Sequence, residues 1–420
     1  MNSNARNTPR GPRMASLAEI APTEMRRWFL IALAVGIVGT AVLIVGGILD
    51  PAQFFRAYLA AWLFCFNIAI GSMIVLIMYH LTGGAWGYLA RRMLEGASQT
   101  LPLLALGFVP IAAGLRYLYP FARPDLVAGN KLLQEQHGYM NDQFWWSRAA
   151  MYFAAWLAIA LLLNRWSTAE DRTADSWFGR AMNGVSGLGG VLCGVSLHFA
   201  SIDWILALEP EYHSTISGPL LAGQGLVSGF ALTLIIFTTF CERAPLGAIV
   251  GPKTLNDLGN LMMTFVILFS YLLWFEFMLT WIANMQVDIV WYGVRTQGFW
   301  GWLLVSMAVL QFIVPFVLLL QRTVKRHPRT LRAVAGLCLV MQLLFVHWQI
   351  LPSFRPTTFG TWWMSLVAPL GLGGLWFAYY VLRVRSLPLL PLADPHEFEA
   401  VHLRKSDEHE AAWEESLVHE

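Results

Sequence analysis

Charged side chains are scarce in this sequence. Lys, Arg, Asp and Glu together make up 13% of its 420 residues, about half of the share that is usual in soluble domains. Hydrophobic residues make up 57%, and the chain contains 19 Trp and 26 Phe. This balance excludes an ordinary soluble protein and predicts an integral membrane protein. The formal net charge of +2 gives no indication of a nucleic-acid partner.

Cysteine is also scarce. The four cysteines, Cys65, Cys193, Cys241 and Cys338, fall singly within or at the ends of different apolar segments. The sequence lacks the CxxC and CxxCH motifs that are typical of iron-sulfur clusters and c-type haem. We therefore expect no covalently bound cofactor and no metal site on this chain.

Long apolar runs, in contrast, are abundant. A hydrocarbon core of about 30 Å requires about 20 apolar residues in a helix, and ten segments have this length. They are residues 28–49, 54–82, 98–119, 145–163, 183–208, 218–241, 257–284, 299–321, 330–350 and 361–382. None shows the alternation of a membrane β-barrel. The predicted fold class is therefore all-α, a polytopic membrane protein with ten transmembrane helices.

Basic residues fall mainly on one side of these spans. With the N-terminus inside, 21 of the 28 Lys and Arg residues lie on the inner side, which the positive-inside rule assigns to the cytoplasm. The other seven are Arg56, Arg116, Arg123, Lys131, Arg148, Arg295 and Arg355. We predict a cytoplasmic N-terminal segment (1–27), a ten-helix membrane domain (28–384) and a cytoplasmic C-terminal tail (385–420).

Ionisable residues occur near the outer end of the fifth span, in LHFASIDWILALEPEYHST (197–215). At about 1.5 Å per residue, His198 lies past the middle of the membrane and Asp203 near its outer boundary. Glu209 and Glu211 lie beyond the boundary, in solvent. An ionisable group at the depth of Asp203 is a candidate functional residue, and the alternative is that it caps or pairs at a helix end. His198 and Asp203 do not share a helix face, because five residues rotate a helix by about 140°.

Glu276, in SYLLWFEFMLTWIAN, lies in the outer half of the seventh span. Its sequence neighbours are aromatic, and no basic residue is near. Desolvation favours the neutral form of a carboxyl, which suits a group that exchanges a proton near neutral pH. The alternative is a protonated Glu276 that donates one hydrogen bond to a neighbouring helix. We predict that Asp203, Glu276 and His198 form a proton-transfer site.

Two more histidines are candidates for binding a cofactor, although packing explains each of them more simply. His347, in LLFVHWQILPSF, lies beside Trp348 near the outer end of the ninth span. His80, in MYHLTGGAWG, lies at the inner edge of the second span. A pair formed by His198 and His347 is the one arrangement that would suit a cytochrome b.

Glycines are concentrated in the fifth span, in GVSGLGGVLCGVS (184–196). Gly190 and Gly194 have the four-residue spacing that lets two membrane helices approach closely. We interpret the run as packing, since it has no preceding strand and lies inside a membrane span. Among the connections, the outer loop 120–144 and the inner loop 164–182 are the extended polar segments.

Three stretches carry a family resemblance. HLTGGAWG (80–87), SIDWILALEPEYHSTISG (201–218) and LTWIANMQVDIVWYGVRTQGFWGW (279–302) resemble the ActF family of bacterial alternative complex III. That complex is a quinol:cytochrome c or quinol:oxidase oxidoreductase, and ActF is similar to the NrfD-like membrane subunits. Where the family pattern suggests a residue like Gln in the seventh span, this chain has Glu276, which favours a role in proton transfer.

The resemblance implies both a fold and a set of partners. The fold would contain two four-helix bundles, at spans two to five and six to nine, with one flanking helix at each end. The partners would be a second NrfD-like membrane subunit, an iron-sulfur subunit and multihaem cytochrome c subunits in a bacterial inner membrane. Quinone or quinol is the implied ligand. A secondary transporter and a purely structural membrane anchor remain as alternatives.

Overall fold

The computed structural model describes residues 16–244, 246–354, 362–392, 394, 396–402 and 404–405. Within these residues the regular elements are helical, apart from one isolated bridge between Ser16 and Pro388. Arg355, most of the N-terminal segment 1–27 and the end of the C-terminal tail lie outside the described residues.

Ten helical segments are long and apolar enough to span a membrane, as the sequence predicts. They are α2 (Pro22–Leu49), α3 (Pro51–Thr82), α4 to α6 (Ala85–Ala113), α10 (Asp142–Thr173), α11 with η3 (Ser176–Leu208), α12 (Ser217–Phe240), α13 (Pro252–Ala283), α15 to α16 (Gly298–Leu320), α18 with η6 (Pro328–Ser353) and α19 (Met364–Val384). The chain is therefore an all-α polytopic membrane protein.

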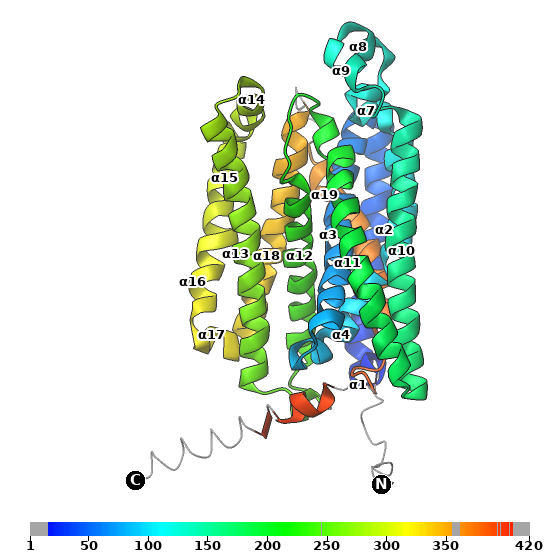
Figure 1. Ribbon diagram of the computed structural model, residues 1–420, viewed down its shortest axis with the longest axis vertical. Coiled ribbons are helices and arrows are strands. Elements are labelled where there is room, and N and C mark those ends of the chain that lie inside the picture. Colours follow the sequence, from blue (N-terminus) through cyan, green and yellow to red (C-terminus); the bar gives the residue numbers. More distant parts are fainter. Residues whose placement is uncertain are drawn as a thin grey trace.

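Shorter helices lie at the two ends of this array (Figure 1). They are α1 (Leu17–Ile20), α7 (Leu115–Leu118), α8 (Pro124–Gly129), α9 (Lys131–Gln136), α14 (Gln286–Arg295) and α17 (Arg322–Arg326). Helices α7, α8, α9 and α14 lie at the top of Figure 1, which we call the α14 end, and α1 lies at the bottom, which we call the α1 end.

The spans form two groups joined by the contact of α3 with α12. The first group contains α3, α4 to α7, α10 and α11, and the second contains α12, α13, α15 to α16 and α18. Helices α2 and α19 form the most extensive helix pair and pack together beside α3. The first and last spans are thus neighbours, and do not flank opposite ends of the bundles.

Two glycine contacts bring pairs of helices close together. A Cβ on Gly71 of α3 would lie 1.7 Å from the carbonyl oxygen of Gly225 on α12. A Cβ on Gly39 of α2 would lie 2.7 Å from the backbone nitrogen of Gly371 on α19. Because only glycine permits such backbone approach, these residues set the distance between the helices.

Gly190 and Gly194 make no close helix approach within the described part of this chain. A Cβ on Gly194 would meet nothing within 4 Å, and one on Gly190 would be in ordinary contact with Ile77, at 3.7 Å. The four-residue spacing describes a face that can pack closely, but another helix must lie against it. At Gly194 that face is exposed.

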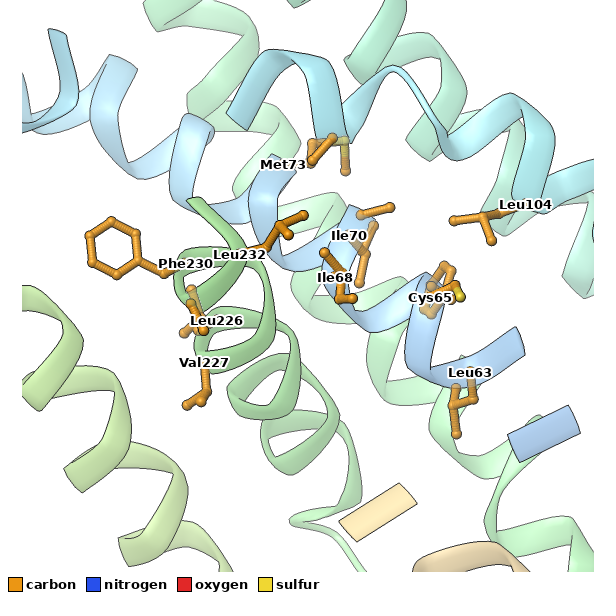
Figure 2. Packing of buried hydrophobic residues seen from close by; sticks show 14 of the residues in the cluster. Leu63, Cys65, Ile68, Ile70, Met73, Leu104, Leu226, Val227, Phe230 and Leu232 are labelled. Carbon is orange, nitrogen blue, oxygen red and sulfur yellow. The ribbon is translucent and has the colours of Figure 1, made fainter. Parts of the chain in front are cut away.

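Apolar side chains fill the seam between α3 and α12. Figure 2 labels Ile68 and Ile70 on α3 and Leu232 and Phe230 on α12, where Leu232 lies toward α3 and Phe230 points to the opposite side of α12. All four are buried. Both helices are buried along most of their length, and the seam between them also contains the hydrogen bond from Asn67 to Gln224.

Two sequence-based boundaries near the α1 end need correction. The third span begins at Ala85 and not at residue 98. Its first helix, α4 (Ala85–Ser98), carries buried charges that lower its hydropathy, and these charges are paired within the protein. The predicted inner loop 164–182 is also largely helical, because α10 continues to Thr173 and α11 begins at Ser176.

Candidate functional site

The Glu276 carboxyl lies near the α14 end of α13 and is buried, with 6% of the residue exposed. Its Oε1 accepts hydrogen bonds from the hydroxyl of Tyr212, at 3.1 Å, and from the hydroxyl of Ser214. Both donors come from the segment that joins α11 to α12. Five carboxyl residues are buried among the described residues: Glu95, Glu170, Asp203, Glu276 and Asp394. Of these, Glu276 is the one without a salt bridge.

Aromatic packing positions Tyr212 as a donor to Glu276. The Tyr212 ring stacks on Trp291 of α14, with ring centroids 4.5 Å apart. Burial and the nearby Glu276 carboxylate raise the pKa of the Tyr212 phenol, so the hydroxyl keeps its proton. The buried Tyr292 hydroxyl has no hydrogen-bond partner among the described residues, and its ring is edge-on to Tyr212 at 6.4 Å.

The Asp203 carboxylate is fully buried near the end of α11 and forms an ion pair with Arg148 of α10. Arg148 donates through Nε to Oδ2 at 2.8 Å and through Nη2 to Oδ1 at 2.7 Å. The Tyr152 hydroxyl also donates to Oδ2, at 2.9 Å, and the Trp145 indole donates to the Asp203 carbonyl. This geometry corresponds to the pairing alternative for Asp203.

His198 lies in the wall of a cavity of about 450 Å³ at the α14 end. The wall also contains Tyr212 and Ser214, which donate to Glu276, and Tyr139, whose ring lies 3.8 Å from the Arg148 guanidinium. Of the sequence-predicted site residues, His198 is the one that lines this cavity directly.

The Glu276 and Asp203 carboxyls do not line this cavity, but each contacts a residue or chain of residues that does. Glu276 is one hydrogen bond away from it, through Tyr212 or Ser214. Asp203 is one ion pair and one ring contact away, through Arg148 and Tyr139. His198 and Asp203 contact different neighbours, as the helical rotation predicts. Of the three predicted site residues, His198 therefore lines the cavity, whereas Glu276 and Asp203 reach it through other side chains.

The other two histidines have different surroundings. The Nδ1 of His347 lies 2.8 Å from the Leu343 carbonyl oxygen, and its Nε2 lies 2.9 Å from the Ser365 carbonyl oxygen. The Nδ1 contact lies within α18, and the Nε2 contact connects α18 with the start of α19. His80 lies at the α1 end of α3, where its carbonyl oxygen accepts a hydrogen bond from Asn183. Neither histidine lies in the wall of the 450 Å³ cavity.

Arg295 and Glu209 form an ion pair that sequence reasoning missed. Their closest nitrogen-oxygen distance is 2.8 Å, and the Arg295 side chain is fully buried. The expectation that Glu209 lies free in solvent is wrong, because its side chain is only 23% exposed. Arg295 also donates to Ser353, and its guanidinium lies 3.7 Å from the Trp291 ring. An arginine in the aromatic run WYGVR was the available signal.

A polar chain continues from Arg295 toward the middle of the membrane. Arg295 donates to the Gln349 carbonyl oxygen at 2.9 Å. The Gln349 side chain accepts from Gln224, and the Gln224 side chain accepts from Asn67. Because these residues come from α14, α18, α12 and α3, the chain of contacts crosses the seam between the two groups of spans.

A second charged cluster lies at the α1 end. Arg91 pairs with Glu95, Glu170 and Asp394, at 2.8, 2.9 and 2.7 Å. Arg92 pairs with Glu95 and with Asp171. Counting Arg91 and Arg92 only as inner basic residues missed this network, although their spacing from Glu95 suits helical ion pairs. Its contacts join α4, α10 and the segment after α19.

No protein-family model matches this chain, and no curated protein matches it. The geometry of the described residues therefore carries the functional argument.

Proposed function

We propose that this chain is an integral membrane subunit of a quinol-oxidising complex, in which the cavity beside His198 serves proton transfer. One observation carries the proposal: Glu276 is buried without a salt bridge and hydrogen-bonded to two residues of the cavity wall. A carboxyl without a cationic contact can take up and release a proton at a small electrostatic cost.

The cavity suits the chemistry of a quinol. Its lining is mostly apolar and aromatic, and it offers a few polar groups, among them His198, Tyr139 and Ser214. This combination is typical of sites for small organic ligands, and the volume is in the usual range of about 300–1,000 Å³. Oxidation of one quinol to a quinone releases two protons and two electrons.

The protons and the electrons take different routes in this proposal. One proton passes to Glu276 through the hydroxyls of Tyr212 or Ser214, and another passes to His198, since an imidazole can both accept and release a proton. Asp203 belongs to the same site as the charge partner of Arg148. The electrons pass to redox partners, an iron-sulfur subunit and multihaem cytochromes, beside a second NrfD-like membrane subunit. These partners correspond to the family resemblance of the sequence.

Replacement of Glu276 by Gln tests the proposal. The variant keeps the side-chain shape and one acceptor oxygen, but it has no titratable proton. Proton-coupled quinol oxidation by the purified complex in liposomes should fall by about two orders of magnitude, because general acid-base groups contribute about that much or more. The matched control is Glu211→Gln, an exposed carboxyl at the same end. Normal turnover and proton stoichiometry in both variants would favour the structural-anchor alternative.

A further inference from the structure

A cavity of about 650 Å³ lies near the α1 end, between α10, α19 and the junction of α4 with α5 (Leu101–Gly107). It is at the opposite end of the spans from the proposed proton site. Its lining contains three arginines, Arg165, Arg172 and Arg383, and no carboxylate. The cavity is therefore a site of positive charge.

This positive charge has no counter-charge in the cavity. Arg165 and Arg172 are exposed, and neither forms an ion pair among the described residues. The nearest acidic residues on the same helix are Glu170 and Asp171, and both pair with the buried network on α4. An anion in the cavity would thus meet guanidinium groups that are not already neutralised.

A hydrogen-bonded row of side chains forms one wall of the cavity. The Nε of Arg383 donates to the Gln99 side chain at 2.8 Å. Gln99 in turn donates to Asn164 at 2.8 Å, and Asn164 donates to the Ser98 hydroxyl at 3.0 Å. This row fixes the position of Arg383 and leaves its terminal guanidinium nitrogens available for a ligand.

The α10 wall changes from charged to apolar along its length. It contributes Arg172, Thr168, Arg165, Leu161 and Leu157, in order from the α1 end toward the middle of the membrane. Steps of three and four residues keep these side chains on one helix face, over about 22 Å. The ligand must therefore be an amphiphile, with an anionic group at the α1 end and an apolar part that points into the membrane.

We propose that this cavity binds an anionic phospholipid. The phosphate lies among the three arginines, since guanidinium groups match phosphate oxygens in geometry and charge. An acyl chain follows Leu161 and Leu157 toward the middle of the membrane, where Pro102 lines the same cavity. Basic pockets between membrane helices bind acidic headgroups in this way. The proposal does not depend on quinol or on the proton site.

Native mass spectrometry of the full-length protein in detergent tests this proposal. The protein is titrated with phosphatidylglycerol and with phosphatidylcholine that carry the same acyl chains. We expect tighter binding of phosphatidylglycerol. The double variant Arg165→Gln/Arg172→Gln should weaken that binding by about 25-fold, or about fivefold for each arginine, and leave phosphatidylcholine unchanged. Arg172→Gln alone serves the same test if the double variant does not accumulate.

The control is Arg180→Gln, an exposed arginine at the same end that hydrogen-bonds to Ser176 and does not line the cavity. Equal affinity of the wild type for the two lipids would overturn the proposal. So would a double variant that binds phosphatidylglycerol as well as the control does. Displacement of the lipid by millimolar inorganic phosphate, with no dependence on acyl-chain length, would instead assign the cavity to a soluble anion.

Discussion

The Arg148–Asp203 pair gives the sharpest test of how the first group of spans is held together. The variant Arg148→Met keeps most of the side-chain length and removes its charge. Asp203 is fully buried and Arg148 is 7% exposed, so the remaining carboxylate would keep the Tyr152 hydroxyl as a donor but would contact no cation among the described residues. Loss of one partner from a buried pair costs about 3–5 kcal/mol. The lost contact of Arg148 with the Tyr139 ring adds about 1 kcal/mol.

A double-mutant cycle separates this penalty from the net value of the pair. Adding Asp203→Leu to Arg148→Met removes both charges and should restore most of the lost stability, because an apolar pair of similar volume is often as stable as a buried ion pair. The measurement is the free energy of unfolding of the full chain in mixed micelles. A loss below about 1 kcal/mol in Arg148→Met would show that the carboxylate finds another partner or water, and would refute the reasoning.

A separate variant, Asp203→Asn, decides between two roles for Asp203. Asp203→Asn keeps the shape and leaves Arg148 buried without a counter-charge, so we expect lower stability and poorer assembly of the complex. If Asp203→Asn instead assembles normally and only reduces proton-coupled turnover, Asp203 is itself a proton carrier. Glu276→Gln, which breaks no ion pair, should leave assembly intact.

Two further predictions concern the α1 end and the orientation of the chain. Burial acts to raise the pKa of Asp394, but the Arg91 charge and hydrogen bonds from Tyr79 and the His396 N–H hold it below its ordinary 3.8. The contribution of Asp394 to stability is therefore complete above that value and lost as the pH falls below it, and hydrogen exchange in 396–402, corrected for intrinsic rates, should accelerate there. In Asp394→Asn the same segment should exchange rapidly at pH 7. For orientation, thiol labelling of Ala174→Cys and Thr323→Cys should occur only from the cytoplasm and that of Ala128→Cys only from outside; the native cysteines are buried and will not interfere. Labelling of the first two from outside would reverse the predicted topology.

Much of the fold could be predicted because hydrophobic length is a local property of the sequence. The ten spans could be found by counting apolar residues. The observed boundaries differ from the predicted ones where a buried charge is paired with residues distant in the sequence. The start of the third span illustrates this, since Arg91 and Arg92 lower the hydropathy of α4 while Glu170 and Asp394 neutralise Arg91 from elsewhere in the chain. No local rule supplies those partners.

Counting residues along each span predicted that Glu276 and His198 lie toward the same end of the spans, and both lie at the α14 end. Counting could not supply the donors of Glu276, because Tyr212 and Ser214 reach it from a connection about 60 residues earlier in the chain. Arg148 was counted as one of the outer basic residues, and only the packing of α10 against α11 shows that it neutralises Asp203. The sequence therefore indicated which groups are costly to bury, but not which of them are compensated.

The buried carboxyls in the described part of this protein are of two kinds, those that form an ion pair with arginine and the one that does not. Asp203 at the α14 end is held by Arg148 of a neighbouring helix, and Glu95 at the α1 end is held by Arg91 and Arg92 of its own helix; such pairs disfavour any change of charge. Glu276 is held by neutral hydroxyl groups, which can donate to the charged form and accept from the protonated form with a small rotation. Depth in the membrane made Asp203 and Glu276 candidates for proton transfer. The absence of a cationic contact, among the described residues, favours Glu276 as the group whose proton moves.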